Sequence, residues 1–576
     1  MAETLISPGV LALENDQSFI SQQPVTVGAA VIGPAVKGPV EQPTIVTSWS
    51  DYQNKFGTTF ISGGAVYSYF TSIAAYNYFL NGGETLLVAR VASGSFTPAT
   101  TSGSQGTPIL NYNTSESVRF STISQGSLMN STGSIDASGS LISGSPDNIR
   151  YQITNSDTSS GTFSLLIRQG DDNTLNPVIL EAWTNLSLDP TAPNFVSRVI
   201  GDQYKVYDST DNQLVINGTF PNASRYVYVS AVPTPTPFYF DNNGIAKSTF
   251  TGSVPVNVSG TFGGATGNLF YGGASKYYNE IISGVTNIQG INSSSYNNMI
   301  NLLANQDDYR FNVLITPGLF ASEASLGTSQ VNTIINNTQN RGDNIFIADL
   351  VPYSSSITAV VSQANAKNTS YAASYWPWVQ TVDPSSGQLV WVPASTMIAG
   401  VYAFNDSVSE PWFAPAGINR GGLSTVVRAE KKLTQANRDT LYSNKVNPIA
   451  TFPGTGTVVY GQKTLQTKAS ALDRVNVRRL LISLKSYISQ VANNLVFEQN
   501  TIATRNQFLS QVNPYLESVQ QRQGLFAFRV VMDSSNNTPD VIDRNQLVGQ
   551  IYLQPTKTAE FVYLNFNILP TGVEFS

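Results

Sequence analysis

The chain lacks the two residue types that most often carry enzyme chemistry. It has 576 residues but no histidine and no cysteine. Serine or cysteine nucleophiles that depend on a histidine base are therefore excluded in their usual form, as are zinc sites made of Cys and His. Disulfides are excluded too, so stability must come from packing and association. The candidates that remain are carboxylates, glycine-rich turns and arginines.

Three short motifs could still carry chemistry or recognition. Gly454-Thr455-Gly456 begins like a dinucleotide-binding loop, but position 459 is Val and no acidic residue follows at the required distance, so we interpret it as a turn. Arg341-Gly342-Asp343 matches an integrin-binding tripeptide, yet it lies between a predicted helix and a predicted strand, where a charged turn is expected. Asp307-Asp308 could contribute to a metal site, but no other ligand cluster lies nearby in sequence. We predict no catalytic, cofactor-binding or metal site.

The composition favours a protein that makes extensive contacts. Hydrophobic residues make up 41% of the chain and charged residues 12%, about half the usual charged share. A surface of Ser, Thr, Asn, Gln and Gly can be buried with little desolvation of charge. A secreted protein with a neutral surface is the alternative interpretation.

The charge is unevenly distributed along the chain. From Arg428 to Ser576 there are 16 Lys and Arg against 10 Asp and Glu, whereas the remainder has 15 against 27. A basic C-terminal quarter could meet an acidic protein, and its charge is too sparse to favour nucleic acid. We expect no signal peptide, because Met1–Val10 has neither a basic nor an apolar region, and no membrane span.

The pattern of apolar runs divides the chain into five parts. We predict a mixed α+β and α/β multidomain protein: an extended arm at 1–22, an α/β core at 23–91 and 284–422, a β-rich insertion of one or two domains at 92–283, a C-terminal domain at 423–569 and a second arm at 570–576. The core is expected to contain a strand at 25–32, helices at 50–56 and 65–80, a strand at 85–91, and a strand at 311–315 that ends at Thr316-Pro317-Gly318.

The C-terminal domain has the clearest helical pattern. Ser470-Ala471-Leu472-Asp473 has the form of a capping box, and apolar residues then recur every three or four positions: Val477, Leu480, Leu481, Leu484, Ile488, Val491 and Leu495. Two further helices are expected, at 501–511 and from Asn513-Pro514 to Gly524. Strands at 525–532, 546–553 and 560–568 should follow. An apolar strand so near a chain end is unusual, because termini normally fray, and its open edge could pair with another chain.

A loop at 411–421 is the densest run of special residues. Two prolines, two glycines and the Trp412-Phe413 pair predict either a rigid packed loop or a contact loop, and both stay open.

Five motifs together resemble the tail sheath proteins of contractile-tailed bacteriophages. They are Ser7-Pro8-Gly9-Val10, the run Gly82–Val91, the loop Trp412–Gly421, the helix Leu472–Leu480 and the run Thr538–Asn545, and their order and spacing agree with that family. The resemblance covers about 1–91 and 290–576, and leaves the insertion without a known counterpart.

The resemblance implies a structural subunit rather than an enzyme. Copies would form hexameric rings, stacked helically around an inner tail tube, and would contract to drive the tube through the host envelope. The N- and C-terminal arms, at about 5–13 and 572–575, would add strands to a sheet of neighbouring copies that includes the strand at 560–568. The residues of this strand exchange would be Leu5, Ile6, Val10, Leu11, Leu13, Val562, Leu564, Phe566, Val573 and Phe575. The mixed C-terminal sheet would thereby be extended by the arms of neighbouring subunits.

Basic residues of the C-terminal helices would face the tube; the candidates are Arg478, Arg479, Lys485, Arg505 and Arg522. The other implied partners are baseplate and tail terminator proteins, with no nucleic acid, no direct membrane insertion and no cofactor. The location would be the virion tail, assembled in the host cytoplasm.

Two rival functions remain at this stage. The Ser/Thr/Asn-rich insertion is compatible with a bacterial surface or adhesion protein. A carbohydrate-active enzyme is also compatible, because paired carboxylates alone suffice for glycoside hydrolysis, although no spacing in the chain supports it.

Overall fold

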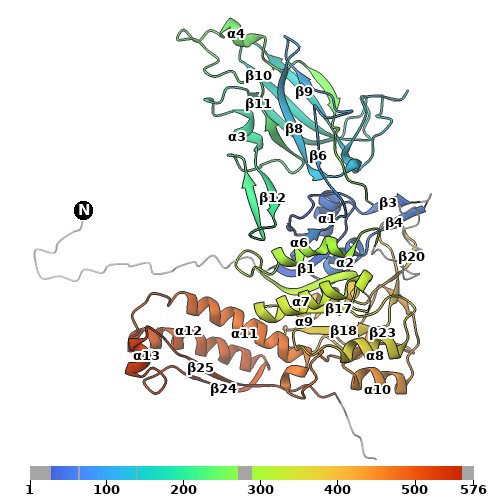
Figure 1. The fold of residues 1–576 in the computed structure, drawn as a ribbon, viewed down its shortest axis with the longest axis vertical. Helices are drawn as coiled ribbons and strands as arrows, with labels where there is room; N and C mark the ends of the chain where they lie inside the picture. Colours follow the sequence, from blue (N-terminus) through green and yellow to red (C-terminus); the bar gives the residue numbers. More distant parts are fainter. Residues whose placement is uncertain (1–26, 63–64, 138, 270–288, 323, 561–576) are drawn as a thin grey trace, which may run out of the picture.

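The computed structural model describes residues 27–62, 65–137, 139–269, 289–322 and 324–560. Figure 1 shows three parts: a β-rich insertion at the top, an α/β core in the middle, and a C-terminal unit of two long helices and a β-hairpin at the lower left. The predicted mixed α/β multidomain class and the β-rich character of the insertion are confirmed.

An eight-stranded sheet forms the centre of the core, in the order β2-β5-β1-β16-β17-β18-β22-β23. The six strands from β5 to β22 run parallel, and an antiparallel strand lies at each edge. Their bounds are β1 (Val27–Gly33), β2 (Thr44–Val46), β5 (Leu86–Arg90), β16 (Phe311–Phe320), β17 (Ile345–Asp349), β18 (Ala372–Trp376), β22 (Val446–Phe452) and β23 (Gly456–Val459). Every residue of β5, β17 and β18 is buried, as expected of parallel strands covered on both faces.

Helices cover this sheet. Helices α2 and α9 pack against each other and on the central strands, α7 packs on β16 and β17, and α8 and α10 lie beside β22. Their bounds are α2 (Phe70–Leu80), α6 (Asn297–Leu302), α7 (Thr328–Arg341), α8 (Ile357–Asn365), α9 (Ser395–Val408) and α10 (Gln435–Ser443). A small sheet of β20 (Leu389–Val392), β19 (Val379–Val382) and β21 (Val426–Ala429) completes the core.

Local sequence explains one helix fully. Helix α1 (Trp49–Phe56) begins where the Ser48 hydroxyl accepts a hydrogen bond from the Asp51 amide, and it ends at Gly57, whose φ is 68°. A side-chain cap and a glycine stop of this kind are the usual helix signals, and the predicted helix at 50–56 is confirmed.

Two other core predictions were wrong. The predicted helix at 65–80 begins only at Phe70, because residues 65–68 form strand β4 (Ala65–Ser68) against β3 (Thr59–Ser62). Strand β16 does not end at Thr316-Pro317-Gly318 but continues to Phe320. The register with β17 shifts in this stretch and Gly318 takes a φ of 90°, so the turn residues form an irregularity within the strand.

The insertion has its own hydrophobic cluster, separate from that of the core. Its larger sheets are β11-β10-β9-β15 and β14-β8-β6, with β7 paired to β8, and β12 and β13 form a hairpin that points toward the core (Figure 1). The bounds are β6 (Pro98–Thr100), β7 (Ile109–Leu110), β8 (Glu116–Gln125), β9 (Ile149–Asp157), β10 (Thr162–Gln169), β11 (Ile179–Ser187), α3 (Val196–Ile200), β12 (Tyr204–Asp208), β13 (Gln213–Asn217), β14 (Val227–Ala231), α4 (Ser248–Thr251) and β15 (Val258–Thr261).

The C-terminal unit consists of α11 (Val475–Asn493), α12 (Ile502–Gln521), β24 (Leu525–Val531), α13 (Pro539–Asp543) and β25 (Gln550–Pro555). The predicted apolar stripe of α11 faces its core, since Leu480, Leu484 and Val491 are buried there. Strands β22 and β23 belong to the core sheet. The compact C-terminal unit therefore begins at α11, later than the predicted start at 423.

Two helix boundaries in this unit differ from the prediction. Ser470 caps only a single 3₁₀ turn at 471–473, and α11 starts after Arg474 without a side-chain cap. The two helices expected around Pro514 are one helix. Val512 and Leu516 are fully buried on its inner face, whereas Pro514 and Ser510 are exposed. Pro514 has no N–H to donate to the Ser510 carbonyl, but this part of the helix is exposed and water can take the place of the missing donor. The burial of Val512 and Leu516 offsets the lost hydrogen bond.

Candidate functional site

The motifs that could have carried chemistry are structural turns. Gly454 and Gly456 lie in the β22–β23 turn with positive φ angles. Arg341 ends α7, forms an ion pair of 2.8 Å with Asp343, and donates to the carbonyls of Leu303 and Tyr309. Its side chain is 3% exposed and is therefore not available as part of a recognition tripeptide.

The carboxylates of the described residues do not gather into a metal site. Asp307 and Asp308 are exposed, and within the described ranges no group of three or more Asp or Glu residues could hold a metal ion. In the same part of the chain, no helix combines the length and the apolarity needed to cross a membrane.

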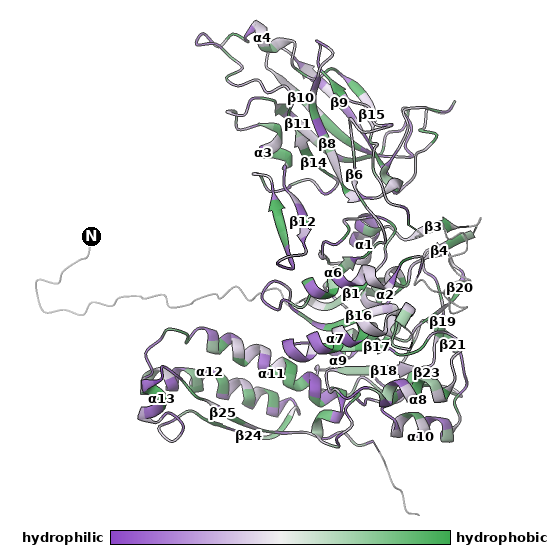
Figure 2. Cartoon of the chain, in the orientation of Figure 1, coloured by the Kyte–Doolittle hydropathy of each residue, from purple (hydrophilic) through white to green (hydrophobic). Residues whose placement is uncertain are grey.

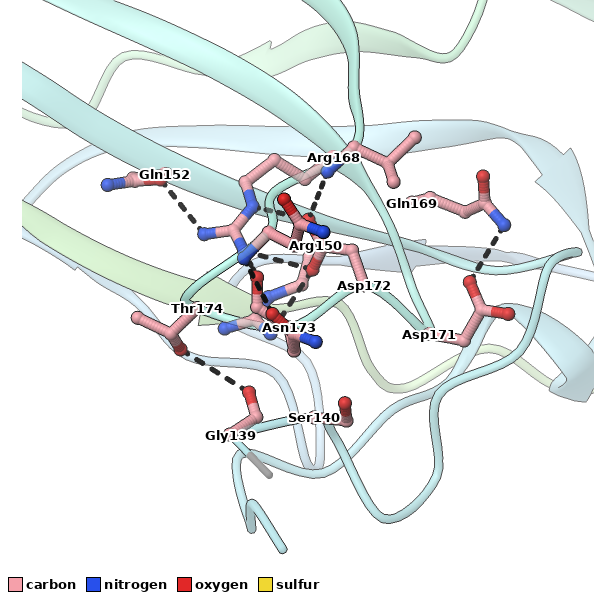
Figure 3. Close-up of polar contacts among 12 residues, drawn as sticks. Gly139, Ser140, Arg150, Gln152, Arg168, Gln169, Asp171, Asp172, Asn173 and Thr174 are labelled. Carbon is pink, nitrogen blue, oxygen red and sulfur yellow. Dashed lines mark hydrogen bonds and ion pairs between the residues drawn. The ribbon is translucent and has the colours of Figure 1, made fainter. Parts of the chain in front are cut away.

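The most buried ionic cluster lies in the insertion and was not found from the sequence (Figure 3). Arg168 donates to both oxygens of Asp172, at 2.7 and 3.0 Å, and Arg150 approaches the same carboxylate at 3.4 Å. Asp172 also accepts from the Val178 amide at 3.0 Å, and Arg168 donates further to Gln152 at 2.9 Å. All three charged side chains are at most 6% exposed, so the cluster fixes the 170–178 loop on β9 and β10.

One buried acid in the core also stands apart. Burial raises the pKa of Asp349 to about 7, although hydrogen bonds from Ser395 and the Gly318 amide oppose the shift. The Ser395 hydroxyl and amide donate to the carboxyl at 2.5 and 3.2 Å. The carboxyl lies at the end of β17 and joins the start of α9 to the sheet.

The strongest candidate for a functional surface is the β24–β25 hairpin. Among the described residues, each of its two strands pairs only with the other. One face packs on the helices through Phe528, Val530, Ile551 and Leu553. Phe526 and Tyr552 remain 71% and 57% exposed. A two-stranded sheet with open edges is marginal alone and offers backbone groups to an added strand.

A polar cluster holds the chain where it leaves this hairpin. The Glu560 carboxylate accepts two hydrogen bonds from Arg474, at 2.7 and 2.9 Å, one from the Tyr442 hydroxyl at 2.7 Å and one from Gln462 at 3.1 Å. Burial alone would raise the pKa of Glu560, but the hydrogen bonds from Arg474 and Tyr442 bring that pKa below its ordinary value. Because 86 residues separate Arg474 from Glu560, no sequence pattern indicated this contact.

The loop at 411–421 anchors the C-terminal unit. Trp412 is 7% exposed and packs in the cluster of α11 and α12. Its indole N–H donates to the Arg522 carbonyl at 3.0 Å. This supports the packed-loop interpretation of the Trp412 end, whereas Ile418 in the same loop is 64% exposed.

The five basic candidates fall into two groups. Arg478, Arg479 and Arg505 are at most 6% exposed. Arg478 donates to Ser370, Arg479 pairs with Asp406, and Arg505 donates to Asn500. These three guanidinium groups stabilise the chain itself and offer no surface to another protein.

Lys485 and Arg522 are exposed. Lys485 lies 3.3 Å from the Tyr371 hydroxyl, and Arg522 forms an ion pair of 2.7 Å with Glu410. The ten residues predicted for strand exchange, within 5–13 and 562–575, lie outside the described residues.

Comparison with known proteins finds two matching domains in the C-terminal half of the chain. The phage tail sheath protein central domain matches residues 292–465, and the phage tail sheath C-terminal domain matches residues 467–569. The tail sheath protein of Vibrio phage KVP40 is 43% identical over 218 residues, which cover 38% of this chain and 32% of that protein. The tail sheath protein of Enterobacteria phage T4 is 41% identical over 185 residues, which cover 32% of this chain and 28% of that protein.

The matched segment thus spans less than a third of either relative. A crystal structure of a sheath tail protein from Listeria innocua covers 92% of this chain and 96% of its own, with a TM-score of 0.51 and 11% identity. That likeness concerns the fold alone. Residues 292–569 thus resemble the central and C-terminal domains of phage tail sheath proteins.

Proposed function

We propose that the chain is the structural subunit of a contractile phage tail sheath. Copies assemble as stacked hexameric rings around an inner tail tube, and contraction of the polymer drives the tube through the host envelope. The observation that carries the proposal is the match of residues 292–569 to two sheath domains. The β24–β25 hairpin supports it, because among the described residues no other strand pairs with either outer edge. The protein acts by assembly and not by catalysis, and it is located in the virion tail.

Strand addition is the proposed bond between copies. Residues 1–22 and 570–576 serve as arms that pair with the C-terminal sheet of a neighbour. The arm residues concerned are Leu5, Ile6, Val10, Leu11, Leu13, Val573 and Phe575, and Val562, Leu564 and Phe566 belong to the strand at 560–568 of the sheet that receives them. Backbone hydrogen bonds supply affinity that depends little on side chains. Strand pairs of this kind would let subunits rotate as rigid bodies without separating, as a change from an extended to a contracted polymer requires.

The parts of the chain take different positions in this proposal. The residues from the start of α11 to 569 form the inner domain and face the tube, residues 23–91 and 284–474 form the middle, and residues 92–283 form the outer surface. Lys485 and Arg522 are the remaining candidates for contact with the tube, because they alone of the five basic candidates are exposed. Exposed pairs contribute about 0–1 kcal/mol each, weak enough to break on contraction. Baseplate and tail terminator proteins bind the two ends of the polymer.

Truncation tests the strand-addition step. Removal of residues 1–20, or of 570–576, should leave a folded monomer that no longer forms long polymers, as measured by circular dichroism and negative-stain electron microscopy. Removal of the exposed β12–β13 tip at 209–212 is the control and should leave assembly intact. Normal polymers from both terminal truncations would refute strand exchange, and cryo-electron microscopy of the wild-type polymer tests the ring arrangement.

A further inference from the structure

The insertion rests on the core at two separate places. The first is a stem made of residues 91–97 and 262–269, which lie side by side where the Thr97 amide donates to the Thr266 carbonyl at 3.2 Å. The second is the β12–β13 hairpin, which points from the insertion toward the core (Figure 1). A cleft of about 1310 Å³, lined by residues beside the stem and by strand β12, lies between the two. A domain held at two places across an open cleft can turn about one of them when the other detaches.

The stem is firmly attached to the core and lies next to a residue with free backbone angles. Arg90, the last residue of β5, is 1% exposed, and its guanidinium donates to the carbonyls of Ala35 at 3.1 Å and Gln125 at 3.0 Å. Gln125 ends β8 in the insertion, and its amide donates to the Gly38 carbonyl at 3.2 Å. Hydrogen bonds from a buried cation are strong. Gly94 in the stem is exposed, with a φ of 94° and no atom within 4 Å of where a Cβ would lie. The stem can therefore act as a hinge that stays attached.

The β12–β13 hairpin is rigidly joined to the insertion at its base. The Asp202 carboxylate accepts hydrogen bonds from the Thr219 amide at 2.8 Å and the Phe220 amide at 2.7 Å, and the Asn222 side chain donates to the Gln203 carbonyl. Five residue pairs then hold β12 to β13. The hairpin carries apolar residues (Figure 2), yet among the described residues neither of its strands pairs with any other strand. The hairpin therefore moves together with the insertion.

The far end of the hairpin touches the core through only a few groups. Tyr207 and Leu214, which are direct cross-strand partners, pack partly buried against the core cluster. The Gln42 side chain donates to the Lys205 carbonyl at 3.0 Å, and this hydrogen bond is exposed. A two-stranded ribbon is marginally stable alone, and small contacts with exposed hydrogen bonds open most readily. The hairpin contact is thus the weaker of the two attachments.

We propose that the β12–β13 hairpin is a detachable strut that holds the insertion at one tilt on the core, and that the insertion turns about the stem when the strut detaches. The tilt can then change while the core sheet and the sheets of the insertion stay intact. The inference concerns contacts within one chain and does not depend on the proposed assembly.

Spin labels can measure the tilt, because the chain contains no cysteine of its own. Ile245→Cys in the insertion and Leu80→Cys at the end of α2 replace residues that are 64% and 52% exposed. Double electron–electron resonance on full-length labelled chains, diluted with unlabelled copies, should give one narrow distance. In the strut variant, Tyr207→Ser with Leu214→Ser, that distance should shift and its distribution should widen. Hydrogen exchange in β12 and β13 should become about tenfold faster or more.

Two controls separate loss of the strut from other effects. Val206 and Val215 form the next cross-strand pair, on the opposite face of the hairpin, and are 49% and 38% exposed. Val206→Ser with Val215→Ser should leave the distance between insertion and core unchanged. A label pair within the insertion, Ile245→Cys with Ile142→Cys, should keep its distance in every variant, since the insertion has its own hydrophobic cluster.

Three results would overturn the inference. An unchanged distance between insertion and core in the strut variant would mean that the stem alone sets the tilt. A wide distribution already present without the serine substitutions would mean that the hairpin does not hold the insertion. A changed distance within the insertion of the strut variant would mean that the hairpin stabilises the fold of the insertion instead of its tilt.

Discussion

Replacing Asp172 by Asn should destabilise the insertion without disturbing the core. The amide keeps the shape of the side chain but removes the only carboxylate that contacts Arg168 and Arg150 in the cluster. Two guanidinium groups, 2% and 6% exposed, would then remain buried without an anion. Removing one partner of a buried ion pair costs about 3–5 kcal/mol. The bidentate geometry and the second arginine place Asp172 in the upper part of that range.

Hydrogen exchange measured by mass spectrometry can locate this loss. Because the insertion has its own hydrophobic cluster, peptides from β9, β10 and β11 should exchange about a hundredfold to several thousandfold faster. Peptides from β16 and β17 should not change. Asp540→Asn is the control, because its partner Arg544 and Asp540 itself are 67% and 83% exposed; it should cost less than about 1 kcal/mol. A loss below about 1 kcal/mol for Asp172→Asn, or equal acceleration in the core, would refute the reasoning.

Three further outcomes are expected. The folded-state pKa of Asp349, about 7, lies above that of the unfolded chain, so the stability supplied by the neutral acid is full below pH 4 and lost as pH rises through 7. Asp349→Asn should therefore gain up to about 4 kcal/mol of unfolding free energy relative to wild type between pH 4 and 8, measured by urea unfolding. A difference that does not change with pH would contradict this. Trp412→Ala should cost about 3–5 kcal/mol in the C-terminal unit, seen as faster exchange in α11 and α12, and no change there would contradict the anchoring role. Because the hydrogen bonds to Glu560 lower its pKa, the stability that its carboxylate supplies is present above pH 4.5 and lost as pH falls. Glu560→Gln should therefore be less stable than wild type at pH 7 and nearly as stable as wild type at pH 3. A difference in stability that widens toward pH 3 would refute the direction of this pKa shift.

Local sequence determined the elements whose signals are short in range. The helix predicted at 50–56 forms as α1 between Ser48 and Gly57, because a cap and a positive-φ stop act within one turn. The apolar run in β5 predicted a buried strand, and the three-and-four spacing in α11 predicted its buried face. Two of the five motifs that resemble the sheath family, at 82–91 and 472–480, include β5 and the start of α11, so the sequence also indicated the function now proposed.

Only the tertiary structure decided where long-range contacts override local preference. Pro514 should end a helix, but buried Val512 and Leu516 hold α12 together across it. Arg478 and Arg479 were expected from the sequence to face a partner protein. Instead, Arg478 donates to Ser370 and Arg479 pairs with Asp406, so both guanidinium groups are buried within the chain. The partners in the Glu560 cluster lie up to 118 residues away along the chain. Such pairs leave no periodic trace in a sequence, because the fold brings them together only after the local elements have formed.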